Sequence, residues 1–209
     1  MDKRRKEFLI GKEYEKYLEY IKKHPKMNLV EMDLVLGKQD GGGAILTFLF
    51  PSIQFMLGYK VKSKEAYEIV RVFDEIEAKI GIRAFRKLFG CILTDQGGEF
   101  QKNKELCTSK ITLGIRTKIF YCHPSSPYEK PNIENVHILL RKVFPKNTSL
   151  KEVTTEDVQE VVSNINSLKK TSLNGKTPNE LFIKAFGKNL LNKLSLRIYE
   201  SEDVILKKY

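Results

Sequence analysis

The order of the predicted elements indicates an α/β domain built around a mixed sheet. Three strand patterns follow one another between residues 28 and 61 and are joined by short turns, as in an antiparallel meander. A helix pattern comes next, and two further strand patterns then lead to residues 95 and 122, followed by helices. We therefore expect a mixed five-stranded sheet that is flanked by helices.

The length and composition of the chain fit one globular domain. With 209 residues, of which 41% are hydrophobic, the chain can bury a substantial core. No apolar run approaches the roughly 20 residues that span a bilayer, and the charged N-terminus lacks the apolar stretch of a secretory signal. The three cysteines, at positions 91, 107 and 122, form no close pair and indicate reduced thiols. We expect a cytoplasmic protein without a membrane partner.

Two of the strand patterns carry an aspartate. Residues 28–37 alternate apolar side chains with a second face that holds Glu31, Asp33 and Val35. Aspartate is disfavoured within strands, so Asp33 indicates an exposed face, a sheet edge or a functional position. The apolar run at 91–94 ends at Asp95, and two glycines that allow a sharp turn follow it closely. Ligands bind beyond the carboxyl ends of strands in such sheets, although a lone acid there can equally be a turn residue or a helix cap.

The remaining patterns are helical. A basic linker helix is predicted within residues 1–26, the core within 27–150, and a C-terminal helical part with a tail within 151–209. The linker helix at 3–23 ends at His24-Pro25. A helix follows Ser63, and a short turn is expected at 85–89. Another helix starts at Pro131, and two more start at Thr154 and at the capping box of Thr177.

The positive charge of the chain is unevenly distributed. The formal net charge is +11, and residues 101–151 hold ten Lys or Arg residues against three acids. A clustered basic excess indicates a polyanion as partner, with nucleic acid first, or else a solvated basic surface.

The predicted order of elements matches a ribonuclease H-like fold with an N-terminal linker helix and C-terminal helices. In this layout the first and fourth strands are neighbours, so Asp33 and Asp95 point into one cleft, and the helix at residue 131 brings Glu134 from the side. Three acids without a basic partner repel one another unless a divalent cation binds them. Oxygen ligands suit Mg²⁺ or Mn²⁺, and two such ions about 4 Å apart can activate a water or a 3′ hydroxyl for displacement at phosphorus.

Four motifs occur in order along the chain. They are Val-Glu-Met-Asp-Leu-Val-Leu-Gly around Asp33, Leu-Thr-Asp-Gln-Gly-Gly-Glu-Phe around Asp95, Ser-Pro-Tyr-Glu-Lys-Pro-Asn-Ile-Glu-Asn before and at Glu134, and the late Lys-Thr-Pro-Asn-Glu-Leu-Phe. Together they resemble the catalytic part of DDE transposases of the insertion-sequence-30 family, relatives of retroviral integrases, from about residue 28 to the end. The resemblance implies that Asp33, Asp95 and Glu134 are the catalytic, metal-binding triad.

The same resemblance implies the chemistry and the partners. The expected reaction is metal-dependent cleavage of DNA at the ends of an element and strand transfer into target DNA, with two Mg²⁺ or Mn²⁺ ions. The expected partner is double-stranded DNA, on which such enzymes assemble as homo-oligomers, and the expected location is the prokaryotic cytoplasm at the nucleoid. The expected DNA contacts are Lys102, Lys104, Tyr128, Lys130, His137, Arg141, Lys142 and Lys146.

The chain departs from the family pattern at three positions. Members commonly have Asn at the position of Gln96, Gly at that of Pro131, and often Asp at that of His123. Pro131 stiffens the approach to Glu134 and could turn it out of the cleft. The family also carries an N-terminal helix-turn-helix that reads the element ends. This chain lacks room for it, so we expect a truncated chain or a decayed gene copy.

Other interpretations of these residues remain open. Glu134 and His137 match the Glu-x-x-His signature of di-iron proteins, but such sites need a second copy, which the sequence lacks. Cys122-His123 has no second pair at zinc spacing. Glu99 is expected to cap the following segment. The alternative functions are a catalytically inactive nucleic-acid-binding remnant and a ribonuclease H-type nuclease.

Overall fold

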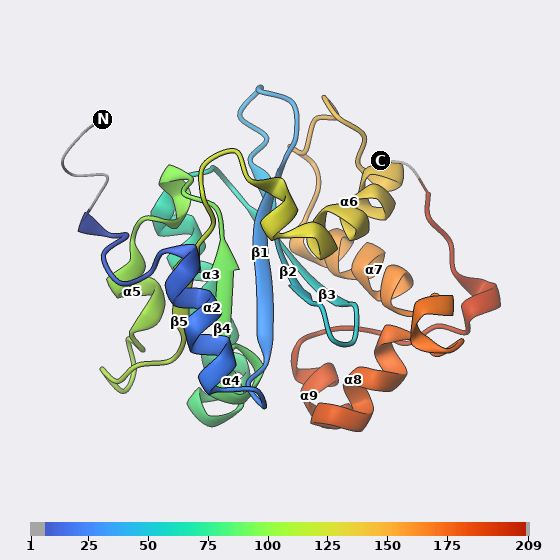
Figure 1. Cartoon of the computed structure of the whole chain (residues 1–209). Helices are drawn as coiled ribbons and strands as arrows, with labels where there is room; N and C mark the ends of the chain where they lie inside the picture. The colour runs from blue at the N-terminus through green and yellow to red at the C-terminus, as the bar shows by residue number, and fades with distance from the viewer. Residues whose placement is uncertain (1–6, 208–209) are drawn as a thin grey trace.

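A computed structural model of the chain describes residues 7–207 and contains a five-stranded mixed sheet with helices on both faces (Figure 1). The predicted strands are confirmed, with ends that differ by no more than two residues. They are β1 (Leu29–Leu36), β2 (Ala44–Phe50), β3 (Phe55–Val61), β4 (Cys91–Thr94) and β5 (Lys118–Tyr121).

The sheet order is β3-β2-β1-β4-β5. β1 pairs antiparallel with β2 and parallel with β4, so the first and fourth strands are neighbours, as the sequence predicts. Leu29 pairs with Cys91 and Glu31 with Leu93. The same register, extended by two residues, brings Asp33 beside Asp95 at the carboxyl ends of the two strands.

Helices cover each face of the sheet. On the face that carries Glu31 and Asp33, here called the acid face, lie α2 (Tyr14–Lys23), α6 (Pro131–Val143) and α7 (Thr155–Asn166). α3 (Ala66–Ile80) and α4 (Ile82–Leu88) cover the opposite face. The chain also forms α5 (Asn103–Cys107), α8 (Pro178–Phe186), α9 (Lys188–Lys193) and 3₁₀ turns at Gly98–Phe100, Pro127–Glu129, Thr171–Leu173 and Ser201–Asp203.

The hydrophobic core continues under α6 and α7 on the acid face, and a large part of it lies between the sheet and α3 and α4. Phenylalanine rings dominate it: the ring of Phe48 on β2 lies 5.5 Å from that of Phe73 and 5.1 Å from that of Phe89, in edge-to-face geometry. On the acid face, α7 packs closely over β3 because Gly58 has no side chain. A Cβ built there would lie only 2.8 Å from Val158.

α2 covers a second, smaller core at the other end of the acid face. Tyr14, Tyr17 and Tyr20 recur every three residues and pack over a buried cluster from β4, β5 and Cys122. The linker helix therefore docks on the domain. All three cysteines are free thiols, as predicted, and no helix among residues 7–207 has the length and hydrophobicity of a membrane span.

Two boundaries differ from the sequence prediction. The helix expected at 3–23 begins at Tyr14, because Gly11 turns the chain at a φ of 72°; residues 1–6 of that prediction lie outside the described part. The short turn expected at 85–89 is instead the helix α4, which starts after Gly81.

Candidate active site

Asp33 and Asp95 lie side by side at the carboxyl ends of β1 and β4. The side chain of Asp33 is 23% exposed and that of Asp95 is 46% exposed. Each carboxylate accepts a local backbone bond: Leu34 N donates to Asp33 Oδ1 at 2.8 Å, and Gly97 N donates to Asp95 Oδ1 at 2.7 Å. These bonds orient both carboxylates at the strand ends.

The ammonium of Lys130 lies between the two carboxylates. Lys130 Nζ is 3.6 Å from Asp33 Oδ1 and 3.5 Å from Asp95 Oδ2, and it donates to the carbonyl oxygen of Met32 at 3.3 Å. Because Asp33 Oδ1 and Asp95 Oδ2 contact the same nitrogen, the distance between these two oxygens cannot exceed the sum of the two contact distances. The arrangement is a ready position for a cation between two acids.

Lys130 corrects two sequence expectations. The acids were expected to have no basic partner, and Lys130 was expected to contact DNA from the surface. In the structure Lys130 is only 5% exposed and points into the protein, because the turn at Pro127–Glu129 and the start of α6 hold it behind the strand ends.

Glu134 lies in the first turn of α6, at the mouth of the site. With Asp33 it lines two adjoining hollows of about 580 Å³ each. The first also contains Asp95 and Lys130; the second follows α6 to Lys146. Within residues 7–207, however, no three acidic, histidine or cysteine side chains are arranged to hold a metal ion. The structure thus brings two members of the predicted triad together and leaves the third beside them.

Glu31 fixes the position of α6, a role that the sequence analysis missed. Its buried carboxylate accepts from the backbone N–H of Ile133 and from the side chain of Asn132, both at 2.7 Å. Burial raises the pKa of Glu31, and the bonds from Asn132 and Ile133 oppose that rise. An acid on a strand thereby caps a helix start. The only signal in the sequence was its position two residues before Asp33 on the same face.

His137 supports the site from one turn farther along α6. Its Nε2 lies 2.8 Å from the hydroxyl of Thr47, and its Nδ1 lies 3.9 Å from Asp33 Oδ2. Burial lowers the pKa of His137 to about 4, although the charge of Asp33 acts in the opposite direction. The imidazole is therefore neutral at pH 7 and largely enclosed, although it still lines the hollow along α6.

His123 forms a clamp at the rim. Its Nδ1 lies 2.8 Å from the buried carboxylate of Glu129, and its Nε2 lies 3.1 Å from Glu15 on α2. The bond with Glu129 raises the pKa of His123.

Glu99 lies near the acid pair. Burial is the largest cause of its raised pKa, and the negative charges of Asp95 and Asp33 add to the rise. Glu99 lies within the turn at Gly98–Phe100, and the helix that follows, α5, has no side-chain cap bond at its N-cap residue Lys102, so the capping role expected of Glu99 is not seen.

The other predicted DNA contacts divide into two groups. Arg141, Lys142 and Lys146 line the hollow along α6, and Arg141 donates to the carbonyl oxygen of Leu36 at 3.0 Å. Lys102 and Lys104 are exposed at α5, and Tyr128 is 75% exposed. Arg116, which belongs to the basic stretch, is fully buried and bonds to Asp74 and Glu77. The basic excess of residues 101–151 is therefore not all surface charge.

No model of a protein family matches the chain. Individual relatives do. The chain is 28% identical over 160 residues to a transposase for insertion sequence element IS4351 of Bacteroides fragilis. The matched region covers 77% of this chain and 46% of that protein. It is 31% identical over 154 residues to a putative integrase of Spiroplasma virus SpV1-R8A2 B, with coverages of 74% and 45%.

A shorter match covers part of the core. The chain is 31% identical over 87 residues to the transposase InsI for insertion sequence element IS30A of Escherichia coli, or 42% of this chain and 21% of that protein. The chain thus spans less than half the length of these curated relatives. By sequence, the chain is a relative of the insertion-sequence-30-type transposases.

Proposed function

We propose that the chain is the catalytic part of a transposase with a ribonuclease H-like fold. It would cleave one strand at the end of an element in double-stranded DNA and join the freed 3′ hydroxyl to target DNA. The observation that carries the proposal is the pair of carboxylates, Asp33 and Asp95, held around one cation at the ends of adjacent parallel strands. The names of the relatives support a function in transposition.

The donor set of the site suits a hard divalent cation. Asp33, Asp95 and Glu134 offer carboxylate oxygens, which Mg²⁺ and Mn²⁺ prefer. The position that Lys130 Nζ takes between Asp33 and Asp95 is the position that we assign to such an ion. Two bound ions would activate the attacking hydroxyl and stabilise the leaving oxygen at phosphorus.

The residues of the chain supply positioning and charge. Glu31 holds the start of α6 against β1 and so keeps Glu134 at the mouth of the site. The hollow along α6 offers Arg141, Lys142 and Lys146 to the phosphates of the DNA backbone. We further propose that the chain acts as a homo-oligomer assembled on DNA, in the cytoplasm at the nucleoid.

The experiment is nicking of supercoiled plasmid by the 209-residue chain with Mg²⁺ or Mn²⁺. Asp95→Asn keeps the size of the side chain but removes the charge, so cleavage should fall by several orders of magnitude while DNA binding persists. Asp33→Asn and Glu134→Gln should behave alike. Glu99→Gln, His123→Asp and the exposed control Glu152→Gln should retain much of the activity. A Glu134→Gln variant as active as the parent would refute the assignment of the third acid.

One observation favours a second candidate, a DNA-binding remnant without catalysis. The ammonium of Lys130 already offsets one of the two negative charges of the acids. A parent chain that binds duplex DNA in a salt-dependent way but does not nick it with either cation would support this candidate. Cleavage of an RNA–DNA hybrid in preference to duplex DNA would instead indicate a ribonuclease H-type nuclease.

A further inference from the structure

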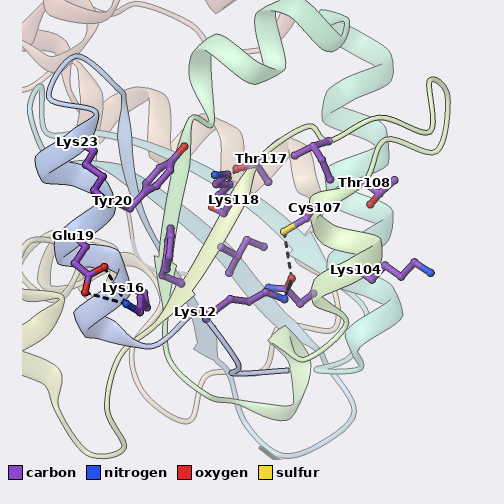
Figure 2. A pocket seen from close by; sticks show the side chains of 15 residues that line it. Lys12, Lys16, Glu19, Tyr20, Lys23, Lys104, Cys107, Thr108, Thr117 and Lys118 are labelled. Atoms are coloured by element: carbon purple, nitrogen blue, oxygen red, sulfur yellow. Dashed lines mark hydrogen bonds and ion pairs between the residues drawn. The ribbon is translucent and has the colours of Figure 1, made fainter. Parts of the chain in front are cut away.

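A third hollow, of about 570 Å³, opens away from the acid pair between α2, α5 and β5 (Figure 2). β5 contributes Ile119 and Phe120 to its lining, and α2 and α5 line it on two sides. The ring of Tyr20 projects from α2 toward β5, so the hollow has an aromatic and aliphatic lining. Its sides come from segments about 100 residues apart in the sequence.

Positive charge surrounds this hollow. Its lining contains one acid, Glu19, and five lysines: Lys12, Lys16, Lys23, Lys104 and Lys118. We call this site the lysine hollow. Among the described residues, the one ion pair within the hollow joins Lys16 to Glu19 at 3.0 Å, and both partners are about half exposed. An exposed pair of this kind neutralises little charge. The lining of the hollow therefore carries a net positive charge.

Two of the lysines are held in place by uncharged groups. Lys12 donates to the side-chain oxygen of Asn103 on α5. The ammonium of Lys118 lies 4.3 Å from the centre of the Tyr20 ring, a cation–π contact. Both contacts position a cation without cancelling its charge. This arrangement is the one expected of an anion-binding site.

We propose that the lysine hollow binds the phosphodiester backbone of the same DNA that the acid site acts on. The proposal rests on the proposed function for the identity of the partner. The geometry favours DNA over a small anion, because β5 runs from Lys118 in the lysine hollow to the rim of the acid site at Cys122. At about 3.3 Å per residue these positions are roughly 13 Å apart. One duplex can therefore reach both, since B-DNA carries a charge about every 1.7 Å of its axis.

The first test removes two charges from the lysine hollow. Lys23→Gln with Lys118→Gln should weaken binding of a short DNA duplex and lower the slope of log affinity against log salt by about 0.9 for each phosphate that the variant no longer neutralises. The matched control is Lys184→Gln with Lys188→Gln, two exposed lysines on α8 and α9 that change the net charge equally. The control should keep the parental slope. Equal slopes for the two double variants would overturn the proposal.

The second test reports from inside the hollow. The chain has no tryptophan, so Tyr20→Trp introduces a single tryptophan there, whose emission can be excited apart from that of the tyrosines. Duplex DNA should change its emission, and the change should vanish when Lys23 and Lys118 are also replaced by Gln. Titration with inorganic phosphate and with a mononucleotide forms the other arm. Saturation by either small anion at concentrations where duplex DNA has no effect would overturn the proposal in favour of a small-anion site.

The two proposals can fail separately. Binding to the lysine hollow is read from the salt slope and from tryptophan emission, and neither depends on cleavage. If the double lysine variant shows the expected lower salt slope but Asp95→Asn still cleaves DNA as the parent does, the proposed catalysis is refuted and the lysine hollow remains a DNA site. If Asp95→Asn abolishes cleavage but the double lysine variant keeps the parental salt slope, the catalysis stands and the lysine hollow is refuted. Circular dichroism of each variant shows whether it is folded.

Discussion

Lys130 and Lys118 show how the surroundings of a lysine side chain determine its role. Lys130 is buried and lies against the oxygens of two carboxylates and of a backbone carbonyl. Lys118, from the same basic stretch of sequence, is exposed and rests on an aromatic ring. The first cation is balanced and holds a site together. The second adds to a positive field that is open to a ligand.

The comparison separates structural charge from binding charge. Removing one member of a buried, balanced pair leaves its partner uncompensated and destabilises the fold. Removing an exposed lysine changes stability little, but it changes attraction to a polyanion. The predictions below test whether this division holds, beginning with the most deeply buried cation.

Arg116→Met should have the largest effect on stability. The guanidinium is completely buried, lies 3.0 Å from the buried Glu77, and stacks near the rings of Phe73 and Phe85. Loss of the charge should lower the free energy of unfolding by about 3–5 kcal/mol, measured by urea denaturation. Arg83→Met, at an exposed position on α4, is the control and should change it by less than about 0.5 kcal/mol. Similar losses in both variants would contradict the division.

Glu31→Gln should have an intermediate effect. The amide replaces one of the two acceptor oxygens with an NH₂ donor, so the present pair of bonds from Ile133 N and Asn132 to separate oxygens is disrupted. The expected loss is about 1–2 kcal/mol in the same experiment, and hydrogen exchange in the first turn of α6 should become faster. Glu152→Gln provides the control. Unchanged exchange around Glu134 would show that Glu31 does not position this helix.

Lys130→Met should remove the positive charge that lies between the carboxylates of Asp33 and Asp95. Asp33 and Asp95 would then face each other without a cation, at an expected cost of about 1–2 kcal/mol because both are partly exposed. Mn²⁺ should raise the melting temperature of this variant more than that of the parent, since the ion would replace the missing charge. Lys142→Met, exposed on α6, should respond to Mn²⁺ as the parent does. An equal response in all three proteins would count against cation binding between the two acids.

The smallest expected effect is a pH dependence at the rim. Glu129 and Glu15 raise the pKa of His123, so the protonated ring is favoured in the folded state. The clamp between α2 and the loop should therefore be complete below the ordinary histidine pKa and should weaken as pH rises through the raised value. NMR titration of the His123 ring measures this pKa. Glu15→Gln should lower it, whereas Glu19→Gln should not. Titration of the parent at or below the ordinary value would exclude the clamp.

Periodicity was sufficient to predict most of the framework. Two-residue alternation placed β1 and the face of Asp33, and the glycines after residue 96 located the end of β4. Thr154 and the capping box at Thr177 gave the starts of α7 and α8. These features are local, so a single segment contains the information.

The charges of the site could not be predicted in the same way. Nothing near Lys130 or Arg116 in the sequence shows that their ammonium and guanidinium groups turn inward, because their acidic partners lie 35 or more residues away. The lysine hollow was missed for a related reason. It unites Lys12, Lys16 and Lys23 with Lys104 and Lys118, so a count over one stretch of sequence divides it.

The docking of the N-terminal segment beside β5 also affects how the chain behaves in crowded solution. β5 is the last strand of the sheet, and an edge strand is a template for pairing with another molecule. The carbonyl of Lys12 accepts the N–H of Tyr121 at 2.9 Å, and Lys118 places a charge on the same strand. The segment that lines the lysine hollow therefore also protects the sheet against edge-to-edge aggregation.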